Sequence, residues 1–372
     1  MSISLWMRFR NMPQQPKPGI DRMRLSLSAR IQASAYLLLL VAFLLASGCS
    51  EPDALVEIHG STMGTTYSVK LVDLPPGLTA DALKAQIDAR LDTVNALMST
   101  YRPDSELSRF NASRSTDWFP VDPELADLVA RAQSISDLSD GAFDVTVGPL
   151  VNLWGFGPDA HPFRIPDQQT IDETRTRVGH DKLDVRDQPP ALRKAHPELY
   201  VDLSAIAKGY GVDQVADLLD RLGVTAYLAE IGGELGAKGT KPGDQPWRIA
   251  IERPEATSRS VYRIVALEDD AMATSGDYRN FFEQDGRIYS HTIDPGTGRP
   301  VAHALASVTV ITEDCATADA LATTFLVLGP ERGLSLAESL GVGAFFVSRV
   351  GDDYAHSATS AFEASVSERD PD

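Results

Sequence analysis

One stretch near the carboxyl end of the chain places a sharply bending turn, a strand-like run and a helix in immediate succession. The turn, residues 291–298, holds a titratable histidine, His291, close to a carboxylate, Asp294. Its proline and two glycines allow the backbone to bend sharply and to approach a ligand closely. The strand-like run covers residues 306–312, and residues 316–323 read as a helix.

The predicted helix suggests a metal site. Asp319 and Thr323 are four residues apart, so both side chains lie on one helix face. A carboxylate and a hydroxyl one turn apart suit a hard cation such as Mg²⁺, which takes oxygen ligands. Ordinary polar positions on a half-exposed helix would give the same pattern, so the pair alone leaves both interpretations open.

Composition limits the possible partners. The chain has 372 residues, of which 43% are hydrophobic, and this is enough for one large domain or two ordinary ones. The formal net charge is −18, and because residues 1–48 contribute positive charge, the remainder is more acidic still. Such a domain should repel nucleic acid, and an anionic ligand would need local Lys or Arg side chains or a bound cation. Neither G-x-G-x-x-G nor G-x-x-x-x-G-K-[ST] occurs.

The amino terminus, residues 1–48, has the layout of a secretory signal peptide: basic residues, an apolar run at 35–45, then small residues. Cys49 follows directly, as in a bacterial lipobox, so we expect it to be lipidated and residues 49–55 to form a tether. An uncleaved anchor is the alternative, and Met23 offers an alternative start. Either way we expect the domain outside the cytoplasm, at the periplasmic side of a bacterial membrane.

The second cysteine, Cys315, has a context unlike that of Cys49, so a disulfide framework is not indicated. Nothing near it in sequence suggests an activated thiol. We predict a small buried hydrophobic residue.

Strands and helices mix without a regular βαβ rhythm, which favours an α+β fold over a doubly wound sheet. Strands are expected within 56–71, at the start of 200–211, within 226–237, and at 247–252, 262–267, 306–312 and 343–348. Helices are expected at 79–98, at 123–139, from within 200–211 to 222, at 316–323 and at 334–340. Residues 99–111 read as a loop, 158–198 as a loop-rich helical insertion, and the tail after about residue 362 as disordered. This pattern predicts one large mixed-sheet domain over residues 56–350, with helices packed on the sheets, and a carboxyl-terminal tail at 351–372.

Two further polar positions attract attention. Asp144 lies between apolar residues, and a buried carboxylate needs a partner, for which a structural hydrogen bond to backbone is the simplest explanation. Lys208 lies where a strand passes into a helix, and helix N–H groups together with a lysine favour a phosphate there. A lysine on a solvated helix face is the commoner alternative.

The motifs, taken in order, resemble the ApbE family, the FAD:protein FMN transferases, from about residue 60 to residue 348. The resemblance rests on residues 60–65, 98–101, 140–146, 201–209, 232–234, 274–276, 291–295 and 318–323. Any one of these motifs is weak, whereas their shared order is specific.

The resemblance implies a T-fold-like α+β domain outside the cytoplasm that uses FAD as substrate and Mg²⁺ as cofactor. Such enzymes move FMN from FAD to a Ser or Thr hydroxyl of an acceptor protein and release AMP. The resemblance assigns FAD binding to Met63, Tyr101, Ala142, Phe143, Asp144, Asp202, Lys208 and Ile293. It assigns Mg²⁺ to the Ala205 carbonyl, Asp319 and Thr323, and catalysis to His291. By analogy, the acceptor is expected to be a subunit of a membrane electron-transfer complex.

Physical chemistry is consistent with these roles. Attack on the FMN phosphorus requires the phosphate charge to be offset, which Mg²⁺ can do. A nearby base helps a poorly nucleophilic hydroxyl by roughly 10²–10⁴-fold, and His291 has a suitable pKa class. Asp294 would orient His291 or act itself, and a purely structural turn histidine is the alternative. Two other functions stay open: an Mg²⁺-dependent FAD pyrophosphatase giving FMN and AMP, and a lipid-anchored FAD-binding protein without chemistry.

Overall fold

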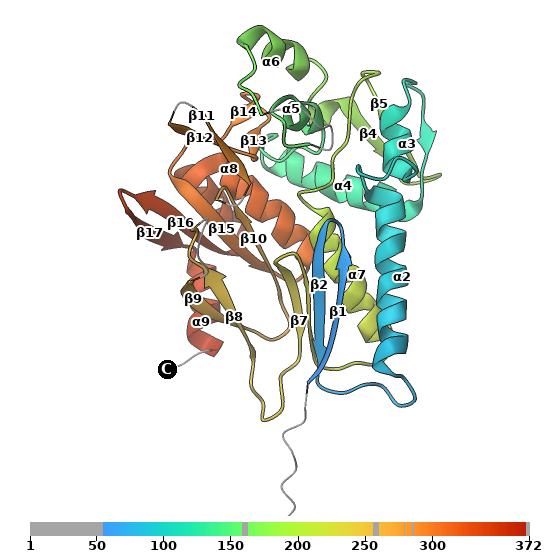
Figure 1. Ribbon diagram of the computed structural model, residues 1–372, viewed down its shortest axis with the longest axis vertical. Helices are drawn as coiled ribbons and strands as arrows, with labels where there is room; N and C mark the ends of the chain where they lie inside the picture. Colours follow the sequence, from blue (N-terminus) through green and yellow to red (C-terminus); the bar gives the residue numbers. More distant parts are fainter. Residues whose placement is uncertain (1–54, 158–162, 256–259, 279, 285, 370–372) are drawn as a thin grey trace, which may run out of the picture. The chain divides into compact units, whose positions relative to one another are not determined.

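The part of the chain that can be described is built around an eight-stranded sheet (Figure 1). The computed structural model describes residues 55–369 except 158–162, 256–259, 279 and 285. The chain divides into two units, Met1–Pro52 and Asp53–Asp372, and all described residues belong to the second. The predicted signal peptide, the lipidation site Cys49 and residues 49–54 of the tether therefore lie outside the described residues.

All neighbouring strands of the large sheet run antiparallel. In spatial order they are β1 (Val56–Thr62), β2 (Thr65–Leu71), β6 (Tyr227–Ile231), β7 (Glu234–Lys238), β10 (Ala271–Gly276), β15 (Leu305–Thr312), β16 (Gly343–Val350) and β17 (Asp353–Ala358). Gly232 and Gly233, with φ of 63° and 110°, make the two-residue turn between β6 and β7. Positive φ at both positions is the conformation that glycine adopts most easily, and it explains this tight bend.

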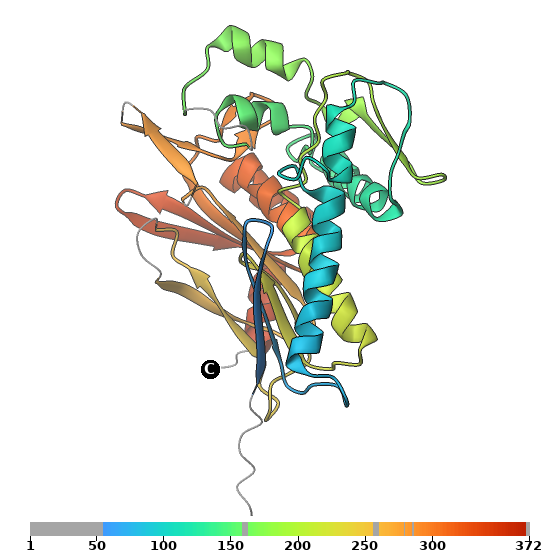
Figure 2. The same ribbon diagram turned by 45° about the vertical axis from the view of Figure 1, so that its right-hand side comes forward.

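Alternating side chains along the strands separate two cores. In β16, Ala344 and Phe346 join the cluster under the helices, whereas Phe345 and Val347 join a second cluster on the other face. Helices α2 (Ala80–Met98), α7 (Ala207–Arg221) and α8 (Cys315–Leu340) cover the first face (Figure 2). The hairpin of β8 (Trp247–Glu252) and β9 (Val261–Leu267), together with α9 (Ser360–Arg369), covers the second.

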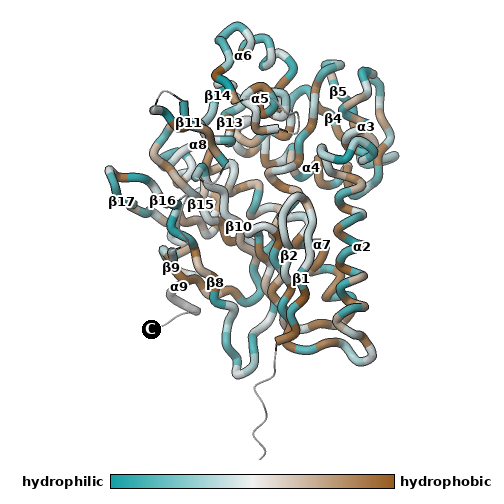
Figure 3. The backbone as a smooth tube through the Cα atoms, in the orientation of Figure 1, coloured by the Kyte–Doolittle hydropathy of each residue, from teal (hydrophilic) through white to brown (hydrophobic). Residues whose placement is uncertain are grey.

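Smaller elements lie beyond one end of this sheet. They are α3 (Glu106–Ala112), α4 (Pro123–Leu138), α5 (Gly148–Leu153), α6 (Gln168–Arg175), η1 (His180–Lys182), the three-stranded sheet β3 (Phe119–Pro120), β5 (Ala191–Lys194) and β4 (Leu183–Arg186), and the hairpins β11 (Phe281–Gln284) with β12 (Arg287–Ser290) and β13 (Ile293–Asp294) with β14 (Arg299–Pro300). Helix α6 is mostly hydrophilic and buries only Ile171 and Thr174 (Figure 3). The predicted insertion at 158–198 thus contains a helix, as expected, and also two strands.

The predicted α+β class is confirmed, and so are most long elements. Helix α2 begins after Thr79, whose side chain accepts a hydrogen bond from Ala82 N, as expected of an N-cap. Strand β8 spans the predicted residues, and α4 ends one residue before the predicted position. The two helices predicted at 316–323 and 334–340 belong to α8, which is interrupted at Gly329, where φ is 79°.

Three expectations were wrong. Residues 106–112 form α3 rather than a loop, because Ser105 caps the helix and Leu107 and Phe110 are buried. Residues 200–203 form no strand and residues 204–206 make a turn, and Asp202 N donates to the Val145 carbonyl. The tail is folded: β17 pairs with β16 beyond the predicted boundary at residue 350, and α9 buries Phe362.

Within the described residues, no helix combines the length and the apolar character needed to cross a membrane.

Candidate functional site

The predicted metal-binding and anion-binding helices meet at one glycine. A Cβ atom on Gly209 of α7 would lie 2.2 Å from the carbonyl oxygen of Cys315, the first residue of α8. Only glycine allows two backbones to approach this closely. The contact brings the first turn of α7 against the first turns of α8, so that Lys208 Nζ lies 3.6 Å from Oδ1 of Asp319.

Asp319 caps the first turn of α7. Its Oδ2 accepts from Gly209 N at 3.1 Å, and because Gly209 is the third residue of α7 this N–H has no carbonyl partner within the helix. Among the described residues, no hydrogen bond to the Ala205 carbonyl is found. The Ala205 carbonyl and Oδ1 of Asp319 are therefore left available for another electropositive partner.

Lys208 lies between two buried carboxylates. Its Nζ is 3.0 Å from Oε1 of Glu234 and 3.6 Å from Oδ1 of Asp319, and these acidic residues are 4% and 3% exposed. Burial alone would lower the pKa of Lys208, but Asp319 and Glu234 outweigh this and raise it, so the side chain is an ammonium. Burial raises the pKa of Glu234 above its ordinary value, although the ammonium opposes the shift.

The donor set fits an oxygen-ligated cation. Thr323 lies one turn after Asp319, and its Oγ1 is 2.9 Å from Oγ of Ser275 in β10. With the Ala205 carbonyl this gives a carbonyl, a carboxylate and a hydroxyl, which are ligands that Mg²⁺ prefers. The described residues contain no group of three or more His, Cys, Asp or Glu side chains that could hold a metal.

His291 is held by a backbone carbonyl. Its Nδ1 lies 3.0 Å from the Asn280 oxygen, and its backbone N–H donates to the same oxygen at 3.1 Å. Because a carbonyl can only accept, Nδ1 carries the proton and Nε2 keeps its lone pair. Burial lowers the pKa of His291. The hydrogen bond to the Asn280 carbonyl and the charge of Asp277 oppose this shift, whereas the nearby charge of Lys208 adds to it. A neutral imidazole close to Lys208 can accept a proton.

Asp294 does not orient His291. Its Oδ1 accepts from Gly296 N at 2.9 Å, and its carbonyl accepts from Gly298 N at 2.8 Å, so it closes its own turn. The described residues show no hydrogen bond or ion pair between His291 and Asp294. The orienting role that the sequence assigned to Asp294 belongs to the Asn280 carbonyl, because a local Asx-type turn satisfies the carboxylate first.

Three of the predicted FAD-binding residues surround the start of α7. Tyr101 is 69% exposed. Its pKa is raised mainly by partial burial and, to a smaller extent, by the charge of Asp202, so the two side chains lie near each other. Oδ1 of Asp202 accepts from Ser204 N and Oγ. Met63 packs over α7, because a Cβ on Gly211 would lie 2.9 Å from its Cε.

The other predicted FAD-binding side chains are more enclosed. Phe143 and Ile293 are 2% and 5% exposed and belong to different hydrophobic clusters. Asp144, 6% exposed, accepts from Thr146 N and Oγ1, both at 2.7 Å, which matches the structural alternative considered from the sequence. Ala142 is partly buried. In this structure, protein atoms cover most of these side chains.

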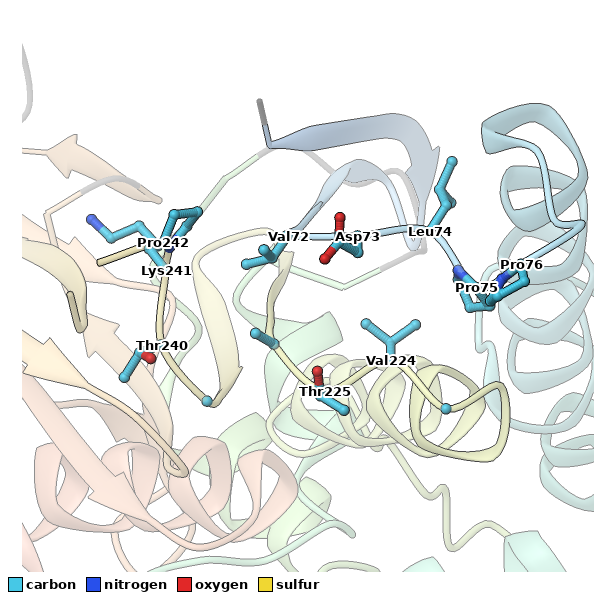
Figure 4. Close-up of a pocket in the computed structure, with 13 residues that line it drawn as sticks. Val72, Asp73, Leu74, Pro75, Pro76, Val224, Thr225, Thr240, Lys241 and Pro242 are labelled. Atoms are coloured by element: carbon cyan, nitrogen blue, oxygen red, sulfur yellow. The ribbon is translucent and has the colours of Figure 1, made fainter. Parts of the chain in front are cut away.

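A pocket of about 500 Å³ lies at the opposite end of α7 (Figure 4). It is lined by residues 72–76, 223–226 and 239–242, in loops that follow β2, α7 and β7. The 15 residues of α7 correspond to about 22 Å between the two ends. None of the predicted site residues lines this pocket, so it does not belong to the candidate site.

Sequence reasoning missed several contributors. Glu234 ends the motif at residues 232–234 but received no role. Asn280 contributes only a backbone atom, which the sequence does not reveal. Asp277 pairs with Arg349 through two contacts of 2.8 and 2.5 Å and faces His291. Asp213 of α7 accepts hydrogen bonds from the first turn of α8. The motif at residues 274–276, which ends directly before Asp277, was a signal that could have pointed to this residue.

Comparison with known proteins places this geometry in a family. The ApbE family model matches residues 63–346. An FAD:protein FMN transferase of Vibrio cholerae serotype O1 is 47% identical over 89% of this chain and 99% of that protein. The protein of the same name from Escherichia coli K12 is 40% identical over 85% of this chain and 93% of its own length.

Solved structures agree. A flavin transferase ApbE from Vibrio cholerae is similar with a TM-score of 0.78 and 46% identity, covering 84% of this chain and 99% of that one. The apo form of the flavinyl transferase ApbE from Pseudomonas stutzeri gives a TM-score of 0.79 and 44% identity over 86% of this chain and 99% of that one. The chain therefore belongs to the ApbE family.

Proposed function

We propose that the protein is a Mg²⁺-dependent FAD:protein FMN transferase, which moves FMN from FAD to a Ser or Thr hydroxyl of an acceptor protein. Relatives that match nearly all of the described chain carry this enzyme name. The observation that carries the proposal is that Gly209 N takes up only Oδ2 of Asp319, so that the Ala205 carbonyl and Oδ1 of Asp319 remain available beside the Lys208 ammonium. Such a set can hold a cation and an anionic phosphate together.

The transfer forms one bond, breaks one bond and moves one proton. The acceptor oxygen bonds to the FMN phosphorus, the bond from that phosphorus to the AMP oxygen breaks, and AMP leaves. The hydroxyl proton passes to Nε2 of His291, whose ring is fixed by the Asn280 carbonyl. A base positioned in this way contributes roughly 10²–10⁴-fold.

The phosphate charge is offset from two sides. Mg²⁺, held by the Ala205 carbonyl, Asp319 and Thr323, would stabilise charge on the phosphates and orient them for in-line attack. Lys208 supplies a second positive charge next to Asp319. Tyr101, exposed near Asp202, offers a ring on which a flat ligand can stack.

We also propose that Cys49 is lipidated and holds the enzyme on the periplasmic side of a bacterial membrane. The order of basic, apolar and small residues before Cys49 supports this proposal. An anchored enzyme would meet acceptors that are fixed in the same membrane, which suits a subunit of a membrane electron-transfer complex.

Intact mass measurement tests the function. The full chain is incubated with FAD, Mg²⁺ and an acceptor domain bearing a target threonine, and both proteins are weighed. We expect the acceptor to gain one FMN, and we expect EDTA or Asp319→Ala to abolish the gain. AMP and free FMN accumulating with several unmodified acceptors would favour a pyrophosphatase instead. FAD that binds and stays intact would favour a carrier.

A further inference from the structure

Glu234 is a buried carboxylate at this site with no part in the chemistry above. It is the first residue of β7, directly after the glycine turn, and is 4% exposed. Its Oε1 is 3.0 Å from Nζ of Lys208, while its Oε2 is buried and finds no hydrogen-bond partner among the described residues. A desolvated carboxylate of this kind is stabilised chiefly by its charged partner, here Lys208.

Lys208 competes with any cation for Asp319. Oδ2 of Asp319 is occupied by Gly209 N, so Oδ1 is the oxygen left for a metal ion. That same Oδ1 is 3.6 Å from the Lys208 ammonium, just beyond hydrogen-bond length. A lysine side chain is flexible, and without an opposing charge the ammonium would close this gap and occupy Oδ1.

Glu234 supplies the opposing charge. The ammonium lies closer to Glu234, at 3.0 Å, than to Asp319, at 3.6 Å, although both carboxylates are almost fully buried. Glu234 leaves the turn at Gly232 and Gly233 as part of a central strand of the large sheet, so its backbone is fixed. The position of Nζ therefore follows from a rigid element rather than from α7 alone.

We propose that Glu234 is a positioning residue: it holds the Lys208 ammonium away from Asp319 and thereby keeps Oδ1 of Asp319 open to the metal ion. This inference rests on the proposed function, because it takes Asp319 to be a metal ligand. The competing explanation is that Glu234 attracts the cation directly through its own negative charge. The two explanations differ in whether Lys208 is required for the effect.

A double-mutant cycle separates them. Mn²⁺, as a probe for Mg²⁺, is titrated into the full chain without FAD at pH 8, and free Mn²⁺ is followed by electron paramagnetic resonance. The proteins are wild type, Glu234→Gln, Lys208→Gln and the double variant. We expect Glu234→Gln to weaken Mn²⁺ binding by on the order of tenfold when Lys208 is present, and by less than about twofold when it is replaced.

Two further variants make the outcome unambiguous. Glu230→Gln removes one charge from the same hairpin, where Glu230 accepts from Ser68 rather than from Lys208, and should leave Mn²⁺ binding unchanged. Asp319→Asn should abolish tight binding. If Glu234→Gln weakens binding by the same factor in both backgrounds, or Glu230→Gln weakens it equally, the positioning role is overturned and the metal site stands. If wild type binds no Mn²⁺, or Asp319→Asn binds as well as wild type, the proposed metal site fails and the inference fails with it.

Discussion

The α7–α8 crossing, residues 205–209 and 315–323, and the His291 segment, residues 277–301, contribute to one candidate site by different structural means. The crossing is made by two helices whose backbones touch at Gly209, with no room for a Cβ atom. The His291 segment is made of two-stranded hairpins outside the large sheet, anchored by the ion pair of Asp277 and Arg349. One region is fixed by exclusion of volume, the other by directional contacts together with the packing of Phe282, Tyr289 and Ile293 in a separate hydrophobic cluster.

The charges differ in the same way. At the crossing, the ammonium of Lys208 lies 3.0 Å from Oε1 of Glu234 and 3.6 Å from Oδ1 of Asp319, so acidic and basic side chains meet in the interior. In the His291 segment, burial favours a neutral ring, and a backbone carbonyl sets its tautomer. Binding geometry therefore depends on packing at the crossing, whereas proton transfer depends on the imidazole of His291, which the Asn280 carbonyl orients.

Gly209→Ala should have the largest effect, because it attacks the crossing itself. The added methyl would lie 2.2 Å from the Cys315 carbonyl oxygen and would force α7 and α8 apart. Overpacking of this kind costs about 1–3 kcal/mol or more, and a displacement of about 1 Å at a catalytic site costs about 10²-fold in rate. We expect thermal stability, Mn²⁺ binding and FMN transfer all to fall. Gly343→Ala is the matched control, because its nearest neighbour would be 3.5 Å away, and wild-type behaviour of Gly209→Ala would refute the packing argument.

His291→Ala should separate the two regions. Loss of the base should lower FMN transfer by roughly 10²–10⁴-fold. Because the crossing does not include His291, the melting temperature and Mn²⁺ affinity should stay close to wild type. Asn280→Ala keeps the backbone carbonyl that orients the ring, so its transfer rate should stay within a few-fold of wild type. A His291→Ala protein with an unchanged rate would leave the histidine a structural role only.

The elements that could be predicted are those with local signals. Thr79 caps α2 through its own side chain, and Gly232 with Gly233 forms a turn that needs positive φ at both positions. Both signals lie within a few residues of the feature they specify. The same locality explains the correct prediction of β8, which is bounded by polar residues and glycine.

The failures needed information from distant parts of the chain. β17 is a strand because β16 lies beside it, and α9 is ordered because Phe362 enters the core on the second face of the sheet. At the site, a resemblance to a family predicts which residues take part but not which atoms form hydrogen bonds with each other. It could not show that the backbone carbonyl of Asn280 would form a hydrogen bond with His291, or that the carboxylate of Asp294 would accept a hydrogen bond within its own turn.

Asp277→Asn and Arg349→Leu should shift the pH dependence of the FMN transfer rate in opposite directions. His291 must be neutral to accept a proton, so the rate falls on the acid side as pH drops through its pKa. The charge of Asp277 favours the protonated ring, so Asp277→Asn should move this acid limb to lower pH. Arg349→Leu leaves Asp277 unpaired and should move the limb to higher pH. Both variants lose the same ion pair, so shifts in the same direction would contradict the assignment.

Asp213→Asn tests the crossing rather than the histidine, through the pH dependence of stability. Asp213 accepts from Cys315 N at 2.7 Å and from Ala316 N at 2.9 Å, which ties α7 to the first turn of α8. Burial raises its pKa to about 7 from an ordinary value near 4, although these hydrogen bonds favour the charged form. The folded protein therefore binds the proton more tightly than the unfolded chain does.

The sign of the effect follows from this linkage. The stabilisation that Asp213 contributes in its protonated form is fully present below about pH 4 and is lost as pH rises towards about 7. The free energy of unfolding of wild type, relative to Asp213→Asn, should therefore fall by about 1–3 kcal/mol between pH 4.5 and 7.5 in urea titrations. Asp314→Asn keeps the cap of the same turn but removes a surface charge, where Asp314 pairs with Arg131, and separates loss of a surface charge from loss of a buried carboxyl. A wild-type difference that stays constant with pH would mean that the crossing carries no buried proton at Asp213, and the electrostatic half of the comparison would then rest on Lys208 and its two carboxylates.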